Sequence, residues 1–293
     1  MNEKIFTSKE ELENKLLSIS NRLVMTKGEY RFPPHCSVED LDWNHMDWAH
    51  RPTIHNTYNN SVRLHAEPNF ALSVTNQKFL GLNVFVQVSD VKIKTGFFYQ
   101  CYTVLGLIYI HGVLENSSET TCFSWYILSP WWLKPLHGVL SRKLYNLNHV
   151  QIAEDVPLRK RRKELRDNGY TFPPEDRDYV TSNDGRMHTV YPKISGSLQK
   201  DLTGMKDGEC LDFQIENSPF FVQLKNSNEV LLWPKVCPHE GGPLEISNKC
   251  ANGAIVCPWH DLQFKPVVVS INPVHCYGGK FQFENGILFI NRI

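Results

Sequence analysis

The sequence predicts an α+β protein in two parts, a mixed N-terminal part and a small all-β C-terminal part. Three observations support this fold class. Helical periodicity occurs near the N-terminus, and a typical helix C-terminal signal occurs in the middle of the chain. Segments between about residues 61 and 128 are rich in β-branched and aromatic residues, and segments after residue 200 are short and strand-like.

Two helices are expected. Apolar residues recur at spacings of four, three and four from Leu12 to Leu23, which predicts a helix over residues 9–24. A second helix is predicted between about residues 140 and 167, and Asn168-Gly169 is a typical C-terminal signal for it.

Strand-like segments fill much of the remaining chain. In the N-terminal part they are residues 83–88, 97–104 and 107–113; in the C-terminal part they are 220–224, 230–233, 254–256, 280–283 and 287–290. Residues 170–200 are rich in Pro, Gly and Ser and are read as a linker. The predicted domains are 1–195, with the linker from about residue 170, and 196–293.

Composition narrows the class of partner. The chain has 293 residues, of which 41% are hydrophobic, and 31 basic residues balance 31 acidic ones. Nothing in this balance argues for nucleic acid, an anionic membrane or an acidic partner. The longest apolar stretch, residues 101–114, is too short and too polar to span a bilayer, which leaves open only association through a surface patch.

The N-terminus has no apolar segment of the signal-peptide kind. Eight cysteines would suggest disulfides in a secreted protein, but two of them sit in a metal-ligand pattern. We therefore expect the others to be mostly reduced and the protein to be cytoplasmic.

That pattern is Cys237-Pro238-His239, seventeen residues, then Cys257-Pro258-Trp259-His260. Each half supplies one thiolate and one imidazole from a tight turn. Two Cys and two His can bind zinc, but zinc fingers usually pair like with like, whereas each turn here mixes the two ligand types. With the flanking Gly-Gly-Pro-Leu, the pattern resembles the Rieske [2Fe–2S] domain, in which the cysteines hold one iron and the histidines the other.

The resemblance covers roughly residues 200–293 and has two departures. Rieske proteins of respiratory complexes add a cysteine in each turn, and this sequence does not, so it is more similar to the Rieske domains of oxygenases and ferredoxins. Asp261 also replaces the glycine that commonly follows the second histidine ligand.

A second motif lies near the N-terminus, where Asn44, Asp47, His50 and His55 form N-x2-D-x2-H-x4-H. It resembles the mononuclear iron motif of Rieske non-haem iron oxygenases, whose catalytic domain is a helix-grip (START-like) antiparallel sheet with helices. Asp47 and His50 are three residues apart, so the carboxylate could orient the imidazole. Pro52 is expected to disrupt the helix and let the two histidines converge.

Two imidazoles and one carboxylate form the facial triad of Fe(II) oxygenases. The family takes its carboxylate from a later helix, which points to Asp155, with Glu154 as the alternative. The resemblance thus implies mononuclear Fe(II) on His50, His55 and Asp155, with Asn44 and Asp47 in catalytic roles. The domain order is reversed, because the Rieske domain normally comes first.

The resemblance also implies how such a protein works. An external reductase or ferredoxin would supply electrons to the [2Fe–2S] cluster, because no dinucleotide-binding G-x-G-x-x-G follows a strand here. Electrons would pass through His239 or His260 and Asp47 to the iron, which would use O2 to oxidise a hydrophobic small molecule. Typical members are homotrimers. Hydroxylation, demethylation, desaturation and ring cleavage are all open.

Aromatic residues are candidates for the substrate pocket, although each is more often ordinary core; they are Phe97, Phe98, Tyr109, Trp125, Trp131 and Trp132. Two rival hypotheses remain. One is a non-catalytic Rieske electron-transfer protein with a START-like lipid- or ligand-binding domain, in which His50, His55 and Asp155 do not converge. The other is an oxygenase that kept the fold and lost turnover.

Overall fold

A computed structural model describes most of the chain, namely residues 9–18, 23–33, 38–67, 70–92, 98–104, 107–116, 121–172, 189–249 and 253–292. Among these residues the chain forms two compact units, one up to Lys163 and one from Glu164 onward. Each unit has its own hydrophobic core. The predicted functional domains, 1–195 and 196–293, stay a prediction.

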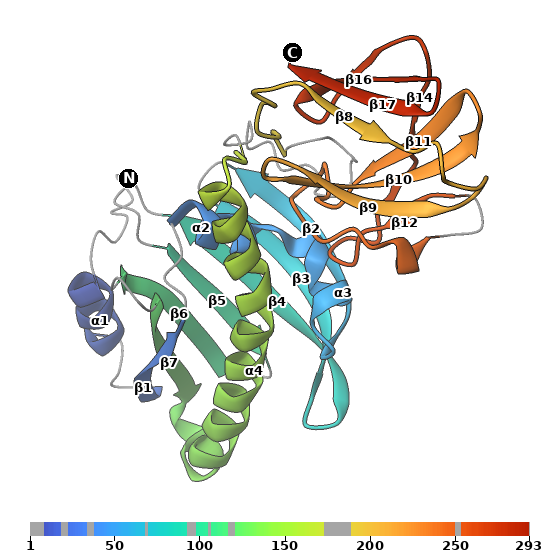
Figure 1. The fold of residues 1–293 in the computed structure, drawn as a ribbon. Helices are drawn as coiled ribbons and strands as arrows, with labels where there is room; N and C mark the ends of the chain where they lie inside the picture. Colours follow the sequence, from blue (N-terminus) through green and yellow to red (C-terminus); the bar gives the residue numbers. More distant parts are fainter. Residues whose placement is uncertain are drawn as a thin grey trace. The chain divides into compact units, whose positions relative to one another are not determined.

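The first unit is built on a seven-stranded sheet with the order β1-β7-β6-β5-β4-β3-β2 (Figure 1). Every neighbouring pair is antiparallel. The strands are β1 (Leu23–Phe32), β2 (Tyr58–Glu67), β3 (Phe70–Phe79), β4 (Leu82–Lys92), β5 (Phe98–Val104), β6 (Leu107–Asn116) and β7 (Thr121–Pro130). Strands β2 to β7 follow one another as hairpins, and β1 closes the far edge.

A long helix, α4 (Lys134–Asp167), lies across one face of this sheet (Figure 1). Its residues Leu144 and Ile152 belong to the core that also holds Tyr109 and Phe123 of the sheet. A short helix, α1 (Lys9–Ser18), packs on the opposite face, where Leu16 contacts Ile110. Tyr109 faces α4 and its neighbour Ile110 faces α1, because successive side chains of a strand point to opposite faces of the sheet.

Between β1 and β2 the chain forms three short helical segments: α2 (Val38–Met46), η2 (Trp48–His50) and α3 (Arg51–Ile54). A further 3-10 turn, η3 (Trp131–Leu133), leads into α4. The inward face of β3 is largely polar, because Ser73, Thr75 and Gln77 are buried there. Buried polar residues on a strand that faces a helix indicate a site between the two layers.

The second unit is a small all-β structure, apart from the end of α4. Its strands are β8 (Leu198–Asp201), β9 (Cys210–Ile215), β10 (Ser218–Asn226), β11 (Glu229–Pro234), β12 (Ile255–Val256), β13 (Gln263–Phe264), β14 (Val267–Val269), β15 (Val274–Cys276), β16 (Gly279–Glu284) and β17 (Ile287–Arg292), with one 3-10 turn, η4 (Ile246–Asn248). They form two four-stranded sheets, β14-β11-β10-β9 and β15-β16-β17-β8, and the pair β12-β13.

These elements confirm the predicted α+β fold class: a helix-grip sheet with a long helix, followed by a small all-β domain. The predicted helix over residues 9–24 is wrong at its end, because α1 stops at Ser18 and Leu23 begins β1. Its periodic leucines therefore serve two different elements. The second helix begins earlier than predicted, at Lys134, and continues through Pro157.

Part of the segment read as a linker is packed. Tyr170, Phe172 and Tyr191 are buried around Val236 of the second unit. Residues 173–188 lie outside the described residues. No helix in the described part of the chain has both the length and the apolar character needed to cross a bilayer.

Candidate functional site

Two turns in the second unit carry the Cys and His residues of the C-x-H and C-x-x-H motifs. In the first turn the Cys237 N–H donates to the Gly242 carbonyl at 2.8 Å. In the second turn the Cys257 N–H donates to the Leu262 carbonyl, again five residues later, at 2.9 Å. The N–H of Gly241 in the first turn, and of Asp261 in the second, donates to the carbonyl of the cysteine four residues earlier, at 3.0 Å in both turns. The two turns thus have the same backbone form, although their sequences differ.

Asp261 occupies the position in the second turn that Gly241 occupies in the first. Both residues have positive φ, 56° for Asp261 and 82° for Gly241. Asp is among the few residues that adopt this left-handed conformation at modest cost. The structure therefore explains how Asp261 can stand where glycine is common.

The four predicted ligands of the cluster are brought together and buried. The rings of His239 and His260 lie 4.8 Å apart, nearly perpendicular, and the Cys237 and Cys257 thiols hydrogen-bond to each other. Burial raises the pKa of Cys237, and the hydrogen bond donated by Cys237 lowers the pKa of Cys257. Backbone N–H groups also donate to each sulfur, which favours the thiolate form.

The surroundings of these ligands fit an inorganic cluster. A Cβ at Gly242 would lie 2.6 Å from the Cys257 sulfur and 3.0 Å from the Trp259 ring, so the backbone approaches the sulfur as closely as only glycine allows. Two sulfur and two nitrogen donors delivered in mixed pairs match the ligand set of a [2Fe–2S] cluster of the Rieske type.

The second motif lies on α2, η2 and α3 in the first unit. The N–H of Asp47 donates to the carbonyl of Trp43 at 2.9 Å, which continues the α2 hydrogen-bond pattern to Asp47. Pro52 stands in the first turn of α3, where proline is favoured, so it begins this helix rather than breaking one. His55 follows the helix in extended conformation, and this change of backbone direction turns its ring toward His50.

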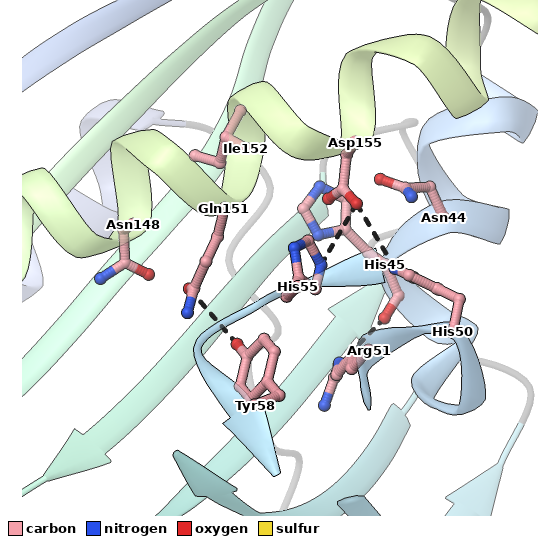
Figure 2. Close-up of a pocket in the computed structure, with 10 residues that line it drawn as sticks. All are labelled: Asn44, His45, His50, Arg51, His55, Tyr58, Asn148, Gln151, Ile152 and Asp155. Carbon is pink, nitrogen blue, oxygen red and sulfur yellow. Dashed lines mark hydrogen bonds and ion pairs between the residues drawn. The ribbon is translucent and has the colours of Figure 1, made fainter. Parts of the chain in front are cut away.

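His50, His55 and Asp155 converge, although Asp155 comes from the distant helix α4 (Figure 2). Their candidate ligand atoms all lie within 4.8 Å of one another. The Nε2 atoms of His50 and His55 are 3.4 and 3.3 Å from the same oxygen, Oδ1 of Asp155. All three side chains are buried.

Each histidine has a second carboxylate at its other ring nitrogen, Nδ1. Nδ1 of His50 lies 3.3 Å from Oδ2 of Asp47, and Nδ1 of His55 lies 2.9 Å from Oε2 of Glu154. A carboxylate at Nδ1 fixes the ring orientation and makes the other nitrogen, Nε2, the more basic ligand. Glu154, the alternative ligand in the sequence, thus lies on the far side of His55 from Asp155.

The charges of His50, His55 and Asp155, which we call the His–Asp cluster, affect one another strongly. Burial alone would lower the pKa of His50, but Asp155 and Asp47 outweigh it and raise the pKa to about 9. The pKa of His55 is also raised, because Asp155 and Glu154 outweigh the effect of burial. Burial would raise the pKa of Asp155, but the two histidines hold it well below its usual range. The cluster thus stabilises positive charge between its members, either as protons or as a metal cation that displaces them.

Two buried ion pairs fasten the α2–α3 segment to its surroundings. Arg51 donates to Ser73 at 2.8 Å and to Asp90 at 3.2 Å on the neighbouring strands. Arg162 of α4 donates to Asp40 at 3.0 Å. Neither pair is evident from the sequence, because the partners are 39 and 122 residues apart and no local pattern connects them.

Beside the cluster lies a cavity of about 20 Å³, enough for roughly one water molecule (Figure 2). Its lining residues are Asn44, His45, His50, Arg51, His55, Tyr58, Asn148, Gln151, Ile152 and Asp155. Within the described chain, the buried Asn44 amide has no hydrogen-bond partner, and Tyr58 donates to Gln151 at 3.3 Å. Asn148, Gln151 and Asp155 recur at spacings of three and four, a signal that could have identified them from the sequence.

The aromatic candidates for a substrate pocket lie elsewhere. Tyr109 and Trp125 belong to the hydrophobic core, as the more common alternative anticipated. Trp131 and Trp132 are 68% and 60% exposed. Phe97 lies outside the described residues, as does the side chain of Phe98.

Comparison with known proteins identifies the second unit. Residues 198–273 match the family model of the Rieske [2Fe-2S] domain. Together with the geometry of the two turns, this match shows that the C-terminal part of the chain is a Rieske domain. No curated protein matches the chain.

Several solved structures are similar to part of the chain. The ZhuI aromatase/cyclase from Streptomyces sp. R1128 is 8% identical, with 48% of this chain and 95% of that one covered and a TM-score of 0.38. The di-domain aromatase/cyclase BexL of the BE-7585A biosynthetic pathway is 9% identical, with 51% and 55% covered and a TM-score of 0.40. A START superfamily protein from Mycobacterium smegmatis is 9% identical, with 45% and 98% covered and a TM-score of 0.33. These values are too low to support conclusions about this chain.

Proposed function

We propose that the protein is a Rieske-type non-haem iron oxygenase that oxidises a small molecule with O2 and externally supplied electrons. The observation that carries this proposal is the convergence of His50, His55 and Asp155 in a chain that also has a Rieske domain. When bound, the [2Fe–2S] cluster would supply single electrons and Fe(II) would supply O2 activation.

The residues around the three candidate ligands support the assignment. Asp47 and Glu154 keep the Nε2 atoms of His50 and His55 directed at the position shared with Asp155. Two imidazoles and one carboxylate leave other positions on the metal open for oxygen and substrate. The side-chain amide of Asn44, buried and facing the same cavity, can donate a hydrogen bond there.

Substrate and partners are part of the proposal. We infer a hydrophobic or aromatic small molecule whose polar group hydrogen-bonds Tyr58, Asn148 or Gln151, since these line the cavity. A cavity of about 20 Å³ admits such a molecule only if lining side chains move. An external reductase or ferredoxin as electron donor, a homotrimer and a cytoplasmic address stay predictions.

The principal rival is a Rieske electron-transfer protein with a ligand-binding helix-grip domain. That function requires no second metal site, and it predicts no convergence of His50, His55 and Asp155. Their separation of at most 4.8 Å favours the oxygenase.

Iron content tests the proposal. Protein purified without oxygen and reconstituted with Fe(II) and sulfide is expected to hold about three irons per chain, two in the cluster and one at the second site. The His50→Ala, His55→Ala double variant should hold about two, with the visible spectrum of the cluster unchanged.

His275→Ala is the matched control, because His275 is exposed and distant in sequence from both motifs. It should keep about three irons. Two irons in both the unmodified protein and the double variant would show that there is no second metal site, and would favour the electron-transfer function. Three irons without oxidation of any substrate would indicate an oxygenase that has lost turnover.

A further inference from the structure

One end of the first unit exposes large apolar side chains from two stretches of the chain. We call them the apolar rim; they are Leu80 and Leu82 at the turn between β3 and β4, and Trp131, Trp132, Leu136 and Val139 on η3 and the start of α4. Each is between 51% and 68% exposed. Scattered exposed apolar residues are ordinary, but a group that includes two adjacent tryptophans is not.

The start of α4 carries apolar residues on its outward side as well as on the side that packs on the sheet. Leu136, Val139 and Lys143 follow one another at spacings of three and four, which places them on one face of α4. The inward face holds buried His137 and Ser141 along with Leu144. The outward face of an amphipathic helix is normally polar. The outward apolar residues therefore do not serve the core.

The turn between β3 and β4 belongs to the same surface. Lys143 and Leu147 of α4 line an open hollow of about 340 Å³ together with Lys78, Phe79 and Leu80. Leu80 has a φ of 53°, a conformation in which glycine or asparagine is usual. An exposed leucine at this position of a turn is favoured neither by solubility nor by backbone geometry.

On the segments that carry the apolar rim, residues 70–89 and 121–153, the charged residues, His apart, are positive. Lys78, Lys134, Arg142 and Lys143 are exposed. The sequence has no Asp or Glu between Phe70 and Ser89 or between Thr121 and Ala153, although the whole chain has as many acidic as basic residues. This end therefore complements a negatively charged partner.

We propose that the apolar rim and its cations dock on an anionic lipid membrane surface. Tryptophan is favoured at the level of the lipid headgroups, and lysine and arginine extend their charges to the phosphates while their stems contact apolar surface. A two-fold interface with a second copy of the chain would place the same four cations opposite one another, which disfavours that occupant. The inference does not depend on the oxygenase proposal.

Binding to vesicles tests this inference with the full chain. It should sediment with vesicles of phosphatidylcholine and phosphatidylserine, much less with phosphatidylcholine alone, and binding should weaken as salt increases. Arg142→Gln, Lys143→Gln should lower the partition coefficient about thirtyfold, since each cation near an anionic surface contributes roughly fivefold. Trp131→Ser, Trp132→Ser should abolish measurable binding.

Matched controls come from the second unit. Val268→Ser, Ile271→Ser removes two exposed apolar side chains, and Lys206→Gln, Lys265→Gln removes two exposed cations. Both controls should bind like the unmodified protein, and circular dichroism should show that all variants are folded.

Two outcomes would overturn the inference. One is that the unmodified protein does not bind the vesicles, or that the apolar-rim variants bind them as well as the control variants do. The other is a dimer, seen by light scattering without vesicles, that the Trp131→Ser, Trp132→Ser variant dissociates; this would make the apolar rim an interface between copies of the chain.

Discussion

Adjacent residues Glu154 and Asp155 have different roles because they contact opposite sides of one imidazole. Asp155 lies at Nε2 of His55, and Glu154 lies at Nδ1. A carboxylate at Nδ1 of a metal-ligating histidine holds the ring and raises its basicity, so in the proposed metal site Glu154 would act as a positioning residue for His55.

We predict that Glu154→Gln weakens metal binding at the His50–His55–Asp155 cluster by about 10- to 100-fold, because the neutral amide no longer supports the imidazole. Titration with Co(II), followed by absorption, measures the affinity without requiring turnover. Asp155→Asn should weaken binding further. Glu164→Gln, an exposed change on the same helix, serves as the control, and equal affinities for the Glu154→Gln and Glu164→Gln variants would contradict the role of Glu154.

At the scale of elements, the segment from α2 to α3 depends on buried ion pairs rather than on its own helices. Helix α3 has four residues and η2 has three, too short to be stable alone. Arg51 connects the segment to β3 and β4, and Asp40 connects it to α4. These anchors fix the backbone from which His50 and His55 project.

We predict that Asp90→Ala lowers the free energy of unfolding by about 3–5 kcal/mol, because it leaves the Arg51 guanidinium buried without its carboxylate. Urea denaturation measures this loss. The Glu29→Ala change removes a carboxylate from an exposed arginine, Arg31, and should cost less than about 1 kcal/mol. Similar losses for the two variants would show that the Arg51–Asp90 pair does not anchor the segment.

At the scale of the whole molecule, each unit has a core of its own. The first core joins the sheet to α4 through residues such as Phe123 and Leu144. The second joins the two small sheets through residues such as Phe220 and Phe281. The four predicted ligands of the [2Fe–2S] cluster all belong to the second unit, so the stability that the cluster confers should be confined to that unit.

We predict two unfolding transitions by calorimetry, of which only one responds to the cluster. Cys257→Ser removes a ligand and should lower that transition by more than about 10 °C, while the other stays within a few degrees. The His50→Ala variant should leave the cluster-dependent transition unchanged. A single transition that moves as a whole would indicate that the two units unfold together.

Much of the protein follows from local sequence. The turns of the Rieske domain are determined by short motifs, because each places its Cys and His through backbone hydrogen bonds within six residues. Strands β4, β5 and β6 also follow from their β-branched and aromatic residues, and the body of α4 from its local sequence and C-terminal signal. The N-terminal leucines were the exception, since a helical spacing crossed the boundary between α1 and β1.

The tertiary structure decided what no local pattern contains. It brings Asp155 to histidines about a hundred residues earlier in the chain. The packing of α4 on the sheet also decides that Asp155 lies at Nε2 of His55 and Glu154 at Nδ1. It also pairs Arg51 with Asp90 and Arg162 with Asp40. Motifs carry the geometry of a few neighbouring residues, whereas the meeting of distant side chains depends on how whole elements pack.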